Sequence, residues 1–158
     1  MDRLVATLPD SVEELCLVRL GILVRRLTAW PYVLRLGRAI QRASDEATRD
    51  GSGLLQSDRM IVGPGHFVVL QYWSSFEALE AWSHRPPHSE WWKGAVERMR
   101  TKSDFGIYHE TYLIPRNGLE SIYLNAPPVG LSAFGPTAPA VGRMTTSRDR
   151  LDRRAGRP

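Results

Sequence analysis

Apolar and polar residues alternate along FGIYHETYLIP, the stretch Phe105–Pro115, and this pattern predicts a β-strand with one buried face. Every second residue falls on the same side of a strand. One side carries Phe105, Ile107, His109, Thr111 and Leu113. The other side carries Gly106, Tyr108, Glu110, Tyr112 and Ile114. His109 therefore interrupts the more apolar face, where a buried imidazole needs a partner or a function.

Three more strands and a helix are predicted before this stretch. Residues 15–27, apolar and interrupted by Gly21, are typical of a strand. Pro31 suits the first turn of a helix. Apolar residues then recur at three- and four-residue steps, as expected for the buried stripe of that helix: Val33, Leu36, Ile40, Ala43 and Ala47. Residues 54–62 and 66–73 flank the turn sequence GPG and are predicted as two strands.

Two helical segments are predicted between residue 74 and the strand at Phe105. Ser74 precedes Glu77 by three residues, which is the spacing of a capping box at a helix start. Pro86 and Pro87 interrupt the helical pattern, and a second segment begins near His88. Apolar and aromatic residues mark the inner sides of the two segments: Phe76, Leu79, Trp82, Trp91, Trp92, Ala95 and Met99. Residues 119–124, LESIYL, are a candidate fifth strand.

The predicted order is βαββαβ, which is the ferredoxin-like α+β arrangement, with an antiparallel sheet and both helices on one face. We expect an N-terminal arm (1–14), this α+β domain (15–125), a Gly/Pro-rich extended arm without helix or strand (126–142) and a basic, disordered tail (143–158). The second face of the sheet also needs a cover. A second copy of the same sheet is the expected cover, which predicts a homodimer, a dimeric α+β barrel, with apolar pockets.

Composition narrows the classes of partner. Apolar residues make up 42% and charged residues 24% of the 158 positions, as in ordinary globular domains. The net charge of +4 arises in residues 143–158, which hold six Arg and two Asp. A basic tail is usually just solvated, and no apolar run approaches the roughly 20 residues of a membrane span. We therefore expect neither a nucleic-acid nor a membrane partner. The single Cys16 and an acidic N-terminus broken by Pro9 favour a cytoplasmic protein without a signal peptide.

Several stretches resemble the monooxygenase-like domain-of-unknown-function family 4188, which belongs to the dimeric α+β barrel superfamily. The resemblance covers about residues 17–143, and Gly21 matches the family. Its most specific pieces are Gln71-Tyr72-Trp73, Ser75-Phe76-Glu77, His88, the strand from Gly106 to Tyr112, and Asn125-Ala126-Pro127-Pro128 with Gly130-Leu131. The chain departs from the family at LVRRLTAW, where a polar segment is usual, and in its compact loop at Pro86-Pro87.

The resemblance implies oxygenation only by analogy. The superfamily includes antibiotic monooxygenases, polyketide cyclases, lactone isomerases, haem-degrading enzymes and, more distantly, haem aldoxime dehydratases. Fold does not choose among these reactions, so the choice depends on the residues of the site.

His109 has two interpretations. It is either a neutral core histidine, hydrogen-bonded to Thr111, a tyrosine or the backbone, or a base, acid or haem ligand that faces a pocket. Glu110 points to the opposite face by strand alternation and is not expected to pair with His109. The resemblance also places a histidine at this point of the strand. We expect His109 to face the cavity and act there.

His84 and His88 lie four residues apart, a metal-ligand spacing, but the prolines between them break the helix and no acidic or thiol residue completes a zinc site. His88 on its own fits haem better. The resemblance implies this, because related haem-degrading barrels place their iron-binding histidine at the corresponding helix position. One histidine with apolar walls is enough for a b-type haem. Haem ligation through His88 or His109 is thus an alternative to a site without a cofactor.

An aromatic set accompanies these histidines and favours either a core and dimer interface or a cage for a flat substrate: Tyr72, Trp73, Trp82, Trp91, Trp92, Tyr108, Tyr112 and Tyr123. Arg59 is interpreted as an anchor for a phenolate or carboxylate, or as a surface charge. The chain has no GxGxxG, GK[ST] or GxSxG motif, which disfavours nucleotide cofactors and serine hydrolysis.

The leading hypothesis is a small monooxygenase-like enzyme that acts on an apolar aromatic or polyketide-like metabolite without a nucleotide cofactor, by oxygenation, cyclisation or dehydration. It assigns His109 as base or acid and Tyr72 and Tyr108 as hydroxyl donors. Trp73, Trp92, Tyr112 and Arg59 are assigned to substrate binding. The alternatives are a haem enzyme of the aldoxime dehydratase or haem-degrading kind, with His88 as ligand, and a ligand-binding dimer without catalysis.

Overall fold

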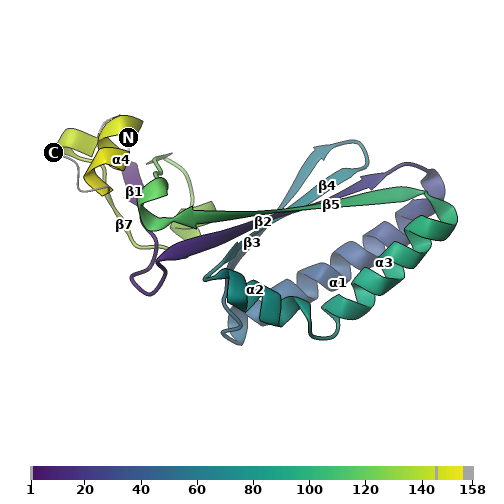
Figure 1. Cartoon of the computed structure of the whole chain (residues 1–158). Helices are drawn as coiled ribbons and strands as arrows, with labels where there is room; N and C mark the ends of the chain where they lie inside the picture. The colour runs from purple at the N-terminus through teal and green to yellow at the C-terminus, as the bar shows by residue number, and fades with distance from the viewer. Residues whose placement is uncertain (1, 145, 155–158) are drawn as a thin grey trace. The chain divides into compact units, whose positions relative to one another are not determined.

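The computed structural model describes residues 2–144 and 146–154, which form two compact units (Figure 1). The larger unit comprises residues 16–112, and the smaller unit comprises residues 1–15 together with residues 113–158. Each unit has its own sheet. In the part of the chain that the structure describes, no helix combines the length and the apolar character needed to cross a bilayer.

The sheet of the larger unit has four strands in the order β3-β4-β2-β5. Its strands are β2 (Glu14–Val24), β3 (Leu54–Gly63), β4 (His66–Trp73) and β5 (Phe105–Pro115). Strand β4 pairs antiparallel with both β2 and β3. This strand order is that of a ferredoxin-like βαββαβ unit, so the predicted fold class is confirmed.

Three helices lie on one face of this sheet (Figure 1). They are α1 (Trp30–Arg49), α2 (Phe76–Ser83) and α3 (His88–Lys102). The apolar stripe predicted for α1 is buried at every position: Val33, Leu36, Ile40, Ala43 and Ala47. Alternate residues of β2 meet these helices, among them Cys16, Val18 and Ile22. Each large apolar side chain buried in this way contributes about 1.5–3 kcal/mol, so the helix stripe and the strand alternation together hold the layers in contact.

Local chemistry sets the ends of the helices. Ser75, not Ser74, is the N-cap of α2, because the Ser75 hydroxyl accepts the Ala78 N–H at 3.1 Å. The capping position predicted from the sequence was therefore one residue too early. Helix α3 ends at Ser103, which adopts a left-handed conformation with φ 48°. The next residue, Asp104, has a buried carboxylate that accepts hydrogen bonds from Arg98, and these bonds hold the pKa of that carboxyl below its usual range.

The smaller unit has a three-stranded sheet in the order β6-β1-β7. Strand β1 (Arg3–Ala6) pairs with β6 (Tyr123–Leu124) and with β7 (Thr137–Pro139). Two short 3₁₀ turns, η2 (Arg116–Gly118) and η3 (Gly130–Ala133), precede β6 and β7, and a third, η4 (Gly142–Met144), follows β7. The guanidinium of Arg116 donates to three backbone carbonyls of the N-terminal segment and so ties the two ends of this unit together.

Three predictions for these terminal segments were wrong. The fifth strand is only two residues long, and it joins β1 rather than the larger sheet. The arm at 126–142 contains the strand β7, because its backbone groups pair with β1. The tail expected to be disordered includes helix α4 (Ser147–Arg154), where Arg150 forms a buried ion pair with Glu120 at 2.7 Å. Residues 145 and 155–158 of that tail lie outside the described residues.

Candidate functional site

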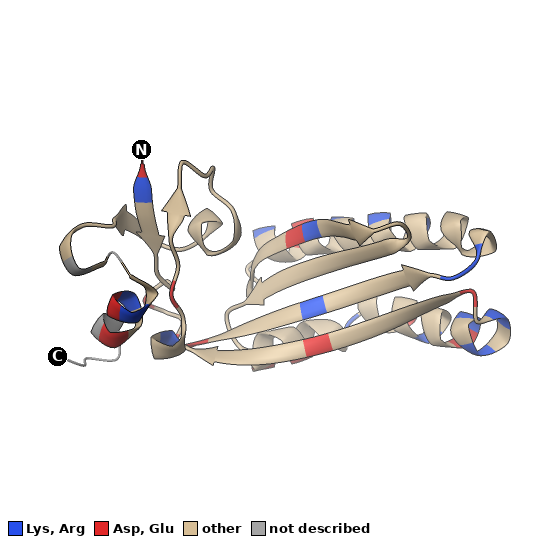
Figure 2. Ribbon diagram, turned by 90° about the horizontal axis from the view of Figure 1, so that it is seen from above, with Lys and Arg blue, Asp and Glu red and all other residues tan. Residues whose placement is uncertain are grey.

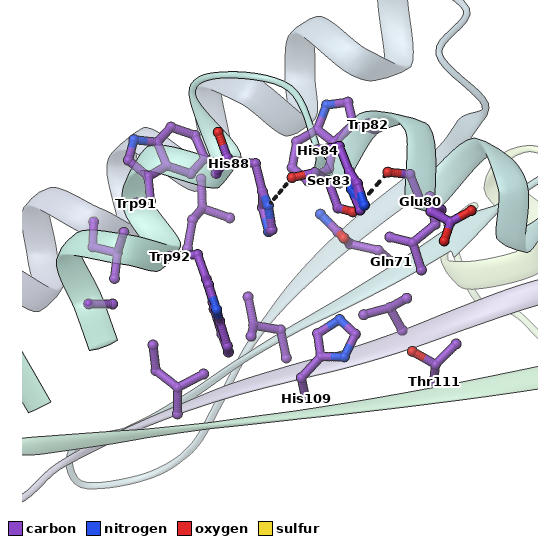
Figure 3. Close-up of a pocket in the computed structure, with 18 of the residues that line it drawn as sticks. Gln71, Glu80, Trp82, Ser83, His84, His88, Trp91, Trp92, His109 and Thr111 are labelled. Atoms are coloured by element: carbon purple, nitrogen blue, oxygen red, sulfur yellow. Dashed lines mark hydrogen bonds between the residues drawn. The ribbon is translucent and has the colours of Figure 1, made fainter. Parts of the chain in front are cut away.

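A cavity of about 730 Å³ lies in the larger unit between the sheet and its helices (Figure 3). The strand β2 and the helix α1 provide apolar walls, among them Val18, Leu20, Leu36 and Ile40. The helices α2 and α3 provide the other side, with Leu79, Trp82 and Trp91. This volume falls within the roughly 300–1,000 Å³ of small-molecule and cofactor sites. The cavity is therefore large enough for a ligand, and its walls favour an apolar one.

His88 enters the cavity from the start of α3 (Figure 3). Its Nδ1 lies 2.9 Å from the backbone carbonyl oxygen of Ser83. A carbonyl only accepts hydrogen bonds, so Nδ1 carries a proton, and in the neutral form of the ring the lone pair is on Nε2. The Ser83 carbonyl is at the end of α2, and the Pro86-Pro87 loop brings α3 back to it. Trp82 packs against the His88 ring with a centroid separation of 4.9 Å and further fixes its orientation.

His109 reaches the same cavity from the opposite wall, on β5 (Figure 3). It has no hydrogen-bond partner among the described residues, so the interpretation as a paired core histidine is not supported. The residue is exposed in the single chain, and its side chain lines the cavity. Desolvation, and then the charge of His88, lower the pKa of His109 below its ordinary value. His109 is thus held in the neutral form at neutral pH, with one ring nitrogen free to accept a proton and the other free to donate one.

Gln71 is the polar residue at the sheet side of the cavity, and only 4% of it is exposed. Its Nε2 donates to the Ser44 hydroxyl at 3.1 Å, and its Oε1 accepts the indole N–H of Trp73 at 3.2 Å. The sequence analysis did not assign a role to Gln71. One feature of the sequence could have pointed to Gln71. It is the single amide on the helix-facing side of the strand HFVVLQYW, where the other residues are Phe67, Val69 and Trp73.

Exposed polar side chains surround the mouth of the cavity. Lys93, His84 and Glu80 line it, and the indole of Trp92 lies there with 48% of its surface exposed. Lys93 has no ion-pair partner within residues 2–144 and 146–154. The mouth therefore offers a free cation beside an aromatic edge. Of the residues assigned from sequence to substrate binding, Trp92 is the one that lines the cavity.

Three tyrosines assigned to the site lie instead on the opposite face of the sheet, which we call the open face. Tyr72, Tyr108 and Tyr112 alternate with the cavity-facing residues of their strands, and this alternation turns their side chains away from the helices. They therefore do not lie beside His109 on the wall of this cavity. The aromatic set had been treated as one cluster, whereas the sheet divides it between two faces.

The other two assigned residues also do not line the cavity. Trp73 is completely buried in the core, where its ring packs against Trp82 with a centroid separation of 5.3 Å. It touches the cavity lining through this ring contact and through its hydrogen bond to Gln71. Arg59 pairs with Val69 in the β3–β4 ladder, and its side chain is exposed. This position agrees with the interpretation of Arg59 as a surface charge. The described residues contain no cluster of three His, Cys, Asp or Glu suited to a metal ion.

The open face carries a polar network of its own. Arg19 and Glu110 form an ion pair at 3.0 Å, and the Tyr112 hydroxyl donates to the same carboxylate at 3.1 Å. The Tyr108 hydroxyl lies 2.9 Å from Nε2 of His66. The Tyr108 ring lies directly over Gly21, where an added Cβ would come within 2.0 Å of the ring carbons. Gly21, singled out in the sequence as an interruption, is therefore required by the close approach of this ring.

Comparison with known proteins places the chain in a family. The sequence profile of the family described as Monooxygenase af470-like matches residues 15–131. The chain belongs to this family. The match includes the whole of the larger unit, and hence every residue that lines the cavity. The chain is thus a monooxygenase-like protein, in agreement with the resemblance of its motifs. No curated protein sequence matches it.

Solved structures share the fold of this Monooxygenase af470-like protein at low sequence identity. The aldoxime dehydratase OxdRE, crystallised with butyraldoxime, is 18% identical with a TM-score of 0.71, covering 97% of this chain and 42% of its own. A second aldoxime dehydratase is 17% identical with a TM-score of 0.70, covering 98% and 44%. A conserved protein of unknown function from Bacteroides thetaiotaomicron is 11% identical with a TM-score of 0.50, covering 65% and 100%. The chain spans less than half the length of the aldoxime dehydratases.

Proposed function

We propose that this protein is a haem enzyme in which His88 would hold the haem iron and His109 would move a proton to or from a small apolar substrate. The observation that carries the proposal is the hydrogen bond from His88 Nδ1 to the Ser83 carbonyl. Histidines that bind metals through Nε2 typically donate the other ring N–H to a carbonyl or carboxylate, which fixes the tautomer and makes the ligand nitrogen more basic. The side chain is therefore prepared for a metal on the cavity side.

The remaining features of the cavity fit a haem. Its volume of about 730 Å³ and its aliphatic and indole walls suit a large, flat, mostly apolar group. A b-type haem can be held by one histidine of the protein, and His88 would provide it. Haem also carries two carboxylates, which need positive charge or water. Lys93 and His84 at the mouth offer donors of hydrogen bonds and positive charge at the place where such groups would reach solvent.

His109 supplies the acid–base chemistry in this proposal. A bound haem would provide an iron centre that accepts a lone pair or an electron from the substrate. The chain would do the rest: apolar walls orient the substrate and exclude water, and the imidazole of His109 takes or gives a proton at a ring nitrogen. General acid–base catalysis of this type contributes about 10²- to 10⁴-fold to a rate. A neutral, unpaired imidazole on the wall facing His88 is suited to it.

Aldoximes are the first substrates to test, since the similar structures include aldoxime dehydratases and one is a complex with butyraldoxime. Conversion of an aldoxime to a nitrile and water breaks the N–O bond and the C–H bond of the oxime carbon. The oxime carbon loses a proton and the leaving hydroxyl gains one. The neutral imidazole would take the first proton at its lone-pair nitrogen and, as imidazolium, give it to the hydroxyl that leaves as water. An apolar alkyl or aryl group would occupy the hollow lined by Leu20, Leu36 and Ile40.

A second copy of the chain is part of the same proposal. The open face exposes apolar side chains, among them Leu23 and Met60, each with 40% of its surface exposed, and Tyr112 with 47%. Charged positions are sparse on the strands of this sheet compared with its helices (Figure 2). Because the chain spans 42% to 44% of the aldoxime dehydratases, two copies would have about their length. A sheet-to-sheet homodimer would bury the open face.

A hemin titration tests the proposal. The wild-type protein should give a sharp Soret band that saturates at one hemin per chain. His88→Ala should abolish the band, whereas the matched variant His84→Ala, which changes a histidine of the cavity mouth, should keep it. A wild-type protein that gives no Soret band with hemin, or a His88→Ala variant that keeps it, would contradict the haem assignment.

A second function is favoured by one observation, the unpaired His109 of lowered pKa. Such an imidazole could act as a base on an apolar aromatic or polyketide-like metabolite that then reacts with O₂ without any cofactor. This is the oxygenation implied by the family name. A colourless protein that takes up no hemin, yet consumes O₂ with such a substrate in a His109-dependent manner, would replace the haem proposal with this one.

A further inference from the structure

The geometry points to Gln71 as the residue that selects the ligand of this cavity: it donates a hydrogen bond to an acceptor oxygen, such as a carbonyl, on an otherwise apolar molecule. The inference rests on the proposed function in one respect, because it takes the same cavity as the ligand site. It does not depend on whether the protein binds haem. It names a chemical class of ligand, an apolar compound with one acceptor oxygen placed against the sheet.

The orientation of the Gln71 amide is fixed by its partners. The indole N–H of Trp73 can only donate, so the atom of Gln71 that meets it at 3.2 Å must be the oxygen Oε1. The nitrogen Nε2 then lies against the Ser44 hydroxyl at 3.1 Å. Both partners are deeply buried, with Ser44 at 1% and Trp73 at 0% exposure. Two hydrogen bonds from a helix and a strand thus hold the amide in one orientation.

The amide has more hydrogen-bonding capacity than the protein uses. A primary amide has two N–H donors and two acceptor lone pairs. Ser44 takes one N–H and Trp73 occupies one lone pair, and the described residues offer no partner for the second N–H. Gln71 is 4% exposed and lines the cavity, so the free N–H belongs to a buried side chain at the cavity wall. A buried donor left unpaired costs about 1–3 kcal/mol, which a ligand with an acceptor would recover.

A second observation is a buried hydroxyl group beside Gln71 that has no hydrogen-bond partner. Ser57 is the cross-strand neighbour of Gln71 in the β3–β4 ladder. Among the buried side-chain nitrogen and oxygen atoms of the described residues, its hydroxyl oxygen is the one without a hydrogen-bond partner. Cross-strand neighbours on one face have Cβ atoms about 4.5–5.5 Å apart. Two adjacent residues therefore hold polar groups in excess of their internal partners, in a region that is otherwise apolar.

Gln71 and His109 face the same hollow from neighbouring parts of the sheet (Figure 3). An oxygen held by the Gln71 N–H would thus lie on the wall that also carries the imidazole. The apolar remainder of the molecule would lie among Val18, Leu20 and Leu79. An analogue of the same shape without the oxygen would leave the amide N–H buried and unpaired, and this difference gives the selectivity.

Two probes with the same carbon skeleton measure this selectivity for an acceptor oxygen. 1-Tetralone has a carbonyl group, and tetralin does not. Calorimetric titration of the purified wild-type protein should show 1-tetralone binding about tenfold more tightly, the effect of one buried hydrogen bond. In Gln71→Met, which keeps the side-chain length but has no N–H, the two affinities should come within about twofold of each other. Equal affinities, or no binding of either probe, for the wild type would overturn the inference.

A matched control separates ligand contact from packing. Ser44→Ala removes the buried partner of Gln71 but leaves its N–H groups, so the preference for 1-tetralone should persist. Loss of the preference in Ser44→Ala as fully as in Gln71→Met would assign Gln71 a structural role only. The control uses the same two probes and the same titration, so both variants report on one quantity.

An infrared measurement keeps the test decisive if Gln71→Met does not fold. The carbonyl band of 1-tetralone bound to the wild type should lie at lower wavenumber than in a hydrocarbon solvent, and it should stay there in His109→Phe. An unshifted band, or a shift that disappears in His109→Phe, would overturn the assignment to Gln71. A negative hemin titration leaves this result untouched, so the two proposals fail separately.

Discussion

The two faces of the four-stranded sheet use their polar groups in opposite ways. On the open face, polar side chains satisfy one another: Arg19 pairs with Glu110, Tyr112 donates to the same carboxylate, and Tyr108 bonds to His66. On the cavity face, polar groups are few and keep unused capacity. His109 has no partner among the described residues, and Gln71 retains one N–H.

This difference indicates which face does chemistry. A saturated network has little left to offer a substrate, but it gives a surface a defined pattern that a second protein surface can match. A wall with unsatisfied donors and acceptors in apolar surroundings is instead costly for the empty protein and favourable for a ligand that pairs with them. The strand β5 carries both situations in adjacent residues, Tyr108 and His109, so the comparison can be tested one position at a time.

The largest effect is expected from this adjacent pair. His109→Phe keeps the volume of the side chain and removes the proton carrier, so dehydration of butyraldoxime by the hemin-loaded protein should fall about 10²- to 10⁴-fold. Tyr108→Phe, one residue along on the open face, should retain most of the activity while losing its bond to His66. Nitrile production under single-substrate conditions measures both. Equal losses in the two variants would remove the distinction between the faces.

The next largest effect concerns assembly through the open face. The wild type should have about twice the 17.8 kDa mass of one chain in light scattering at micromolar concentration. Leu23→Asp places an unpaired charge in the proposed interface and should weaken the dimer at least about 100-fold, because a buried charge without a partner costs several kcal/mol. Leu34→Asp is the control, since Leu34 is a similarly exposed leucine on α1. A wild-type monomer, or equal dissociation in both variants, would contradict the assembly.

A smaller effect is expected where the open face is packed most tightly. In Gly21→Ala the new methyl group would meet the Tyr108 ring, so the ring must shift and its bond to His66 must break. Overpacking of this kind costs about 1–3 kcal/mol. Gly37→Ala in α1, where an added Cβ meets nothing within 4 Å, should instead stabilise the protein by up to about 1 kcal/mol. Urea denaturation measures both, and a neutral Gly21→Ala would mean that the ring adapts freely.

The smallest effect is expected from the ion pair of the open face. Arg19 and Glu110 keep 40% and 43% of their side-chain surface exposed in the single chain. In the Leu23→Asp background, where the dimer is absent, adding Arg19→Ala should change the free energy of unfolding by less than about 1 kcal/mol. Arg100→Ala, which removes an exposed pair with Glu97, provides the comparison. A markedly larger effect of Arg19→Ala in the dimeric wild type would locate the pair within the interface.

The sequence predicted those parts of the fold that depend on local patterns. The five apolar steps predicted for α1 are all buried, although the pattern does not include the buried Ser44, and the alternation in FGIYHETYLIP gives the bounds of β5. The sheet of the smaller unit could not be predicted in the same way. It pairs Arg3 with Leu124, which are far apart in the chain, and strands of two to four residues carry too little alternation to be detected.

The sequence singled out cavity residues only where a single residue carried a signal. His109 stands out as a lone imidazole on an apolar strand face, and His88 stands out through the family resemblance. The structure puts both on the wall of a cavity between the sheet and the helices, whereas the expected cavity lay between the sheets of two chains. Gln71 was missed because its importance depends on Ser44 and Trp73, whose hydrogen bonds appear only once α1 and β4 are packed together. The tyrosines were misplaced because aromatic content was given more weight than the alternation that already separated Tyr108 from His109.

The hollow between the helices and the sheet has a thermodynamic consequence. Its apolar walls forgo the dispersion contacts that a filled interior would have, so part of the cohesion of the larger unit depends on whatever occupies the space. A ligand that binds only the folded chain adds about 2.7 kcal/mol of stability at one hundred times its dissociation constant. The melting temperature of this protein is therefore itself a ligand assay. Apolar ketones, oximes and porphyrins can be ranked by how far each raises the melting temperature, before any reaction is known.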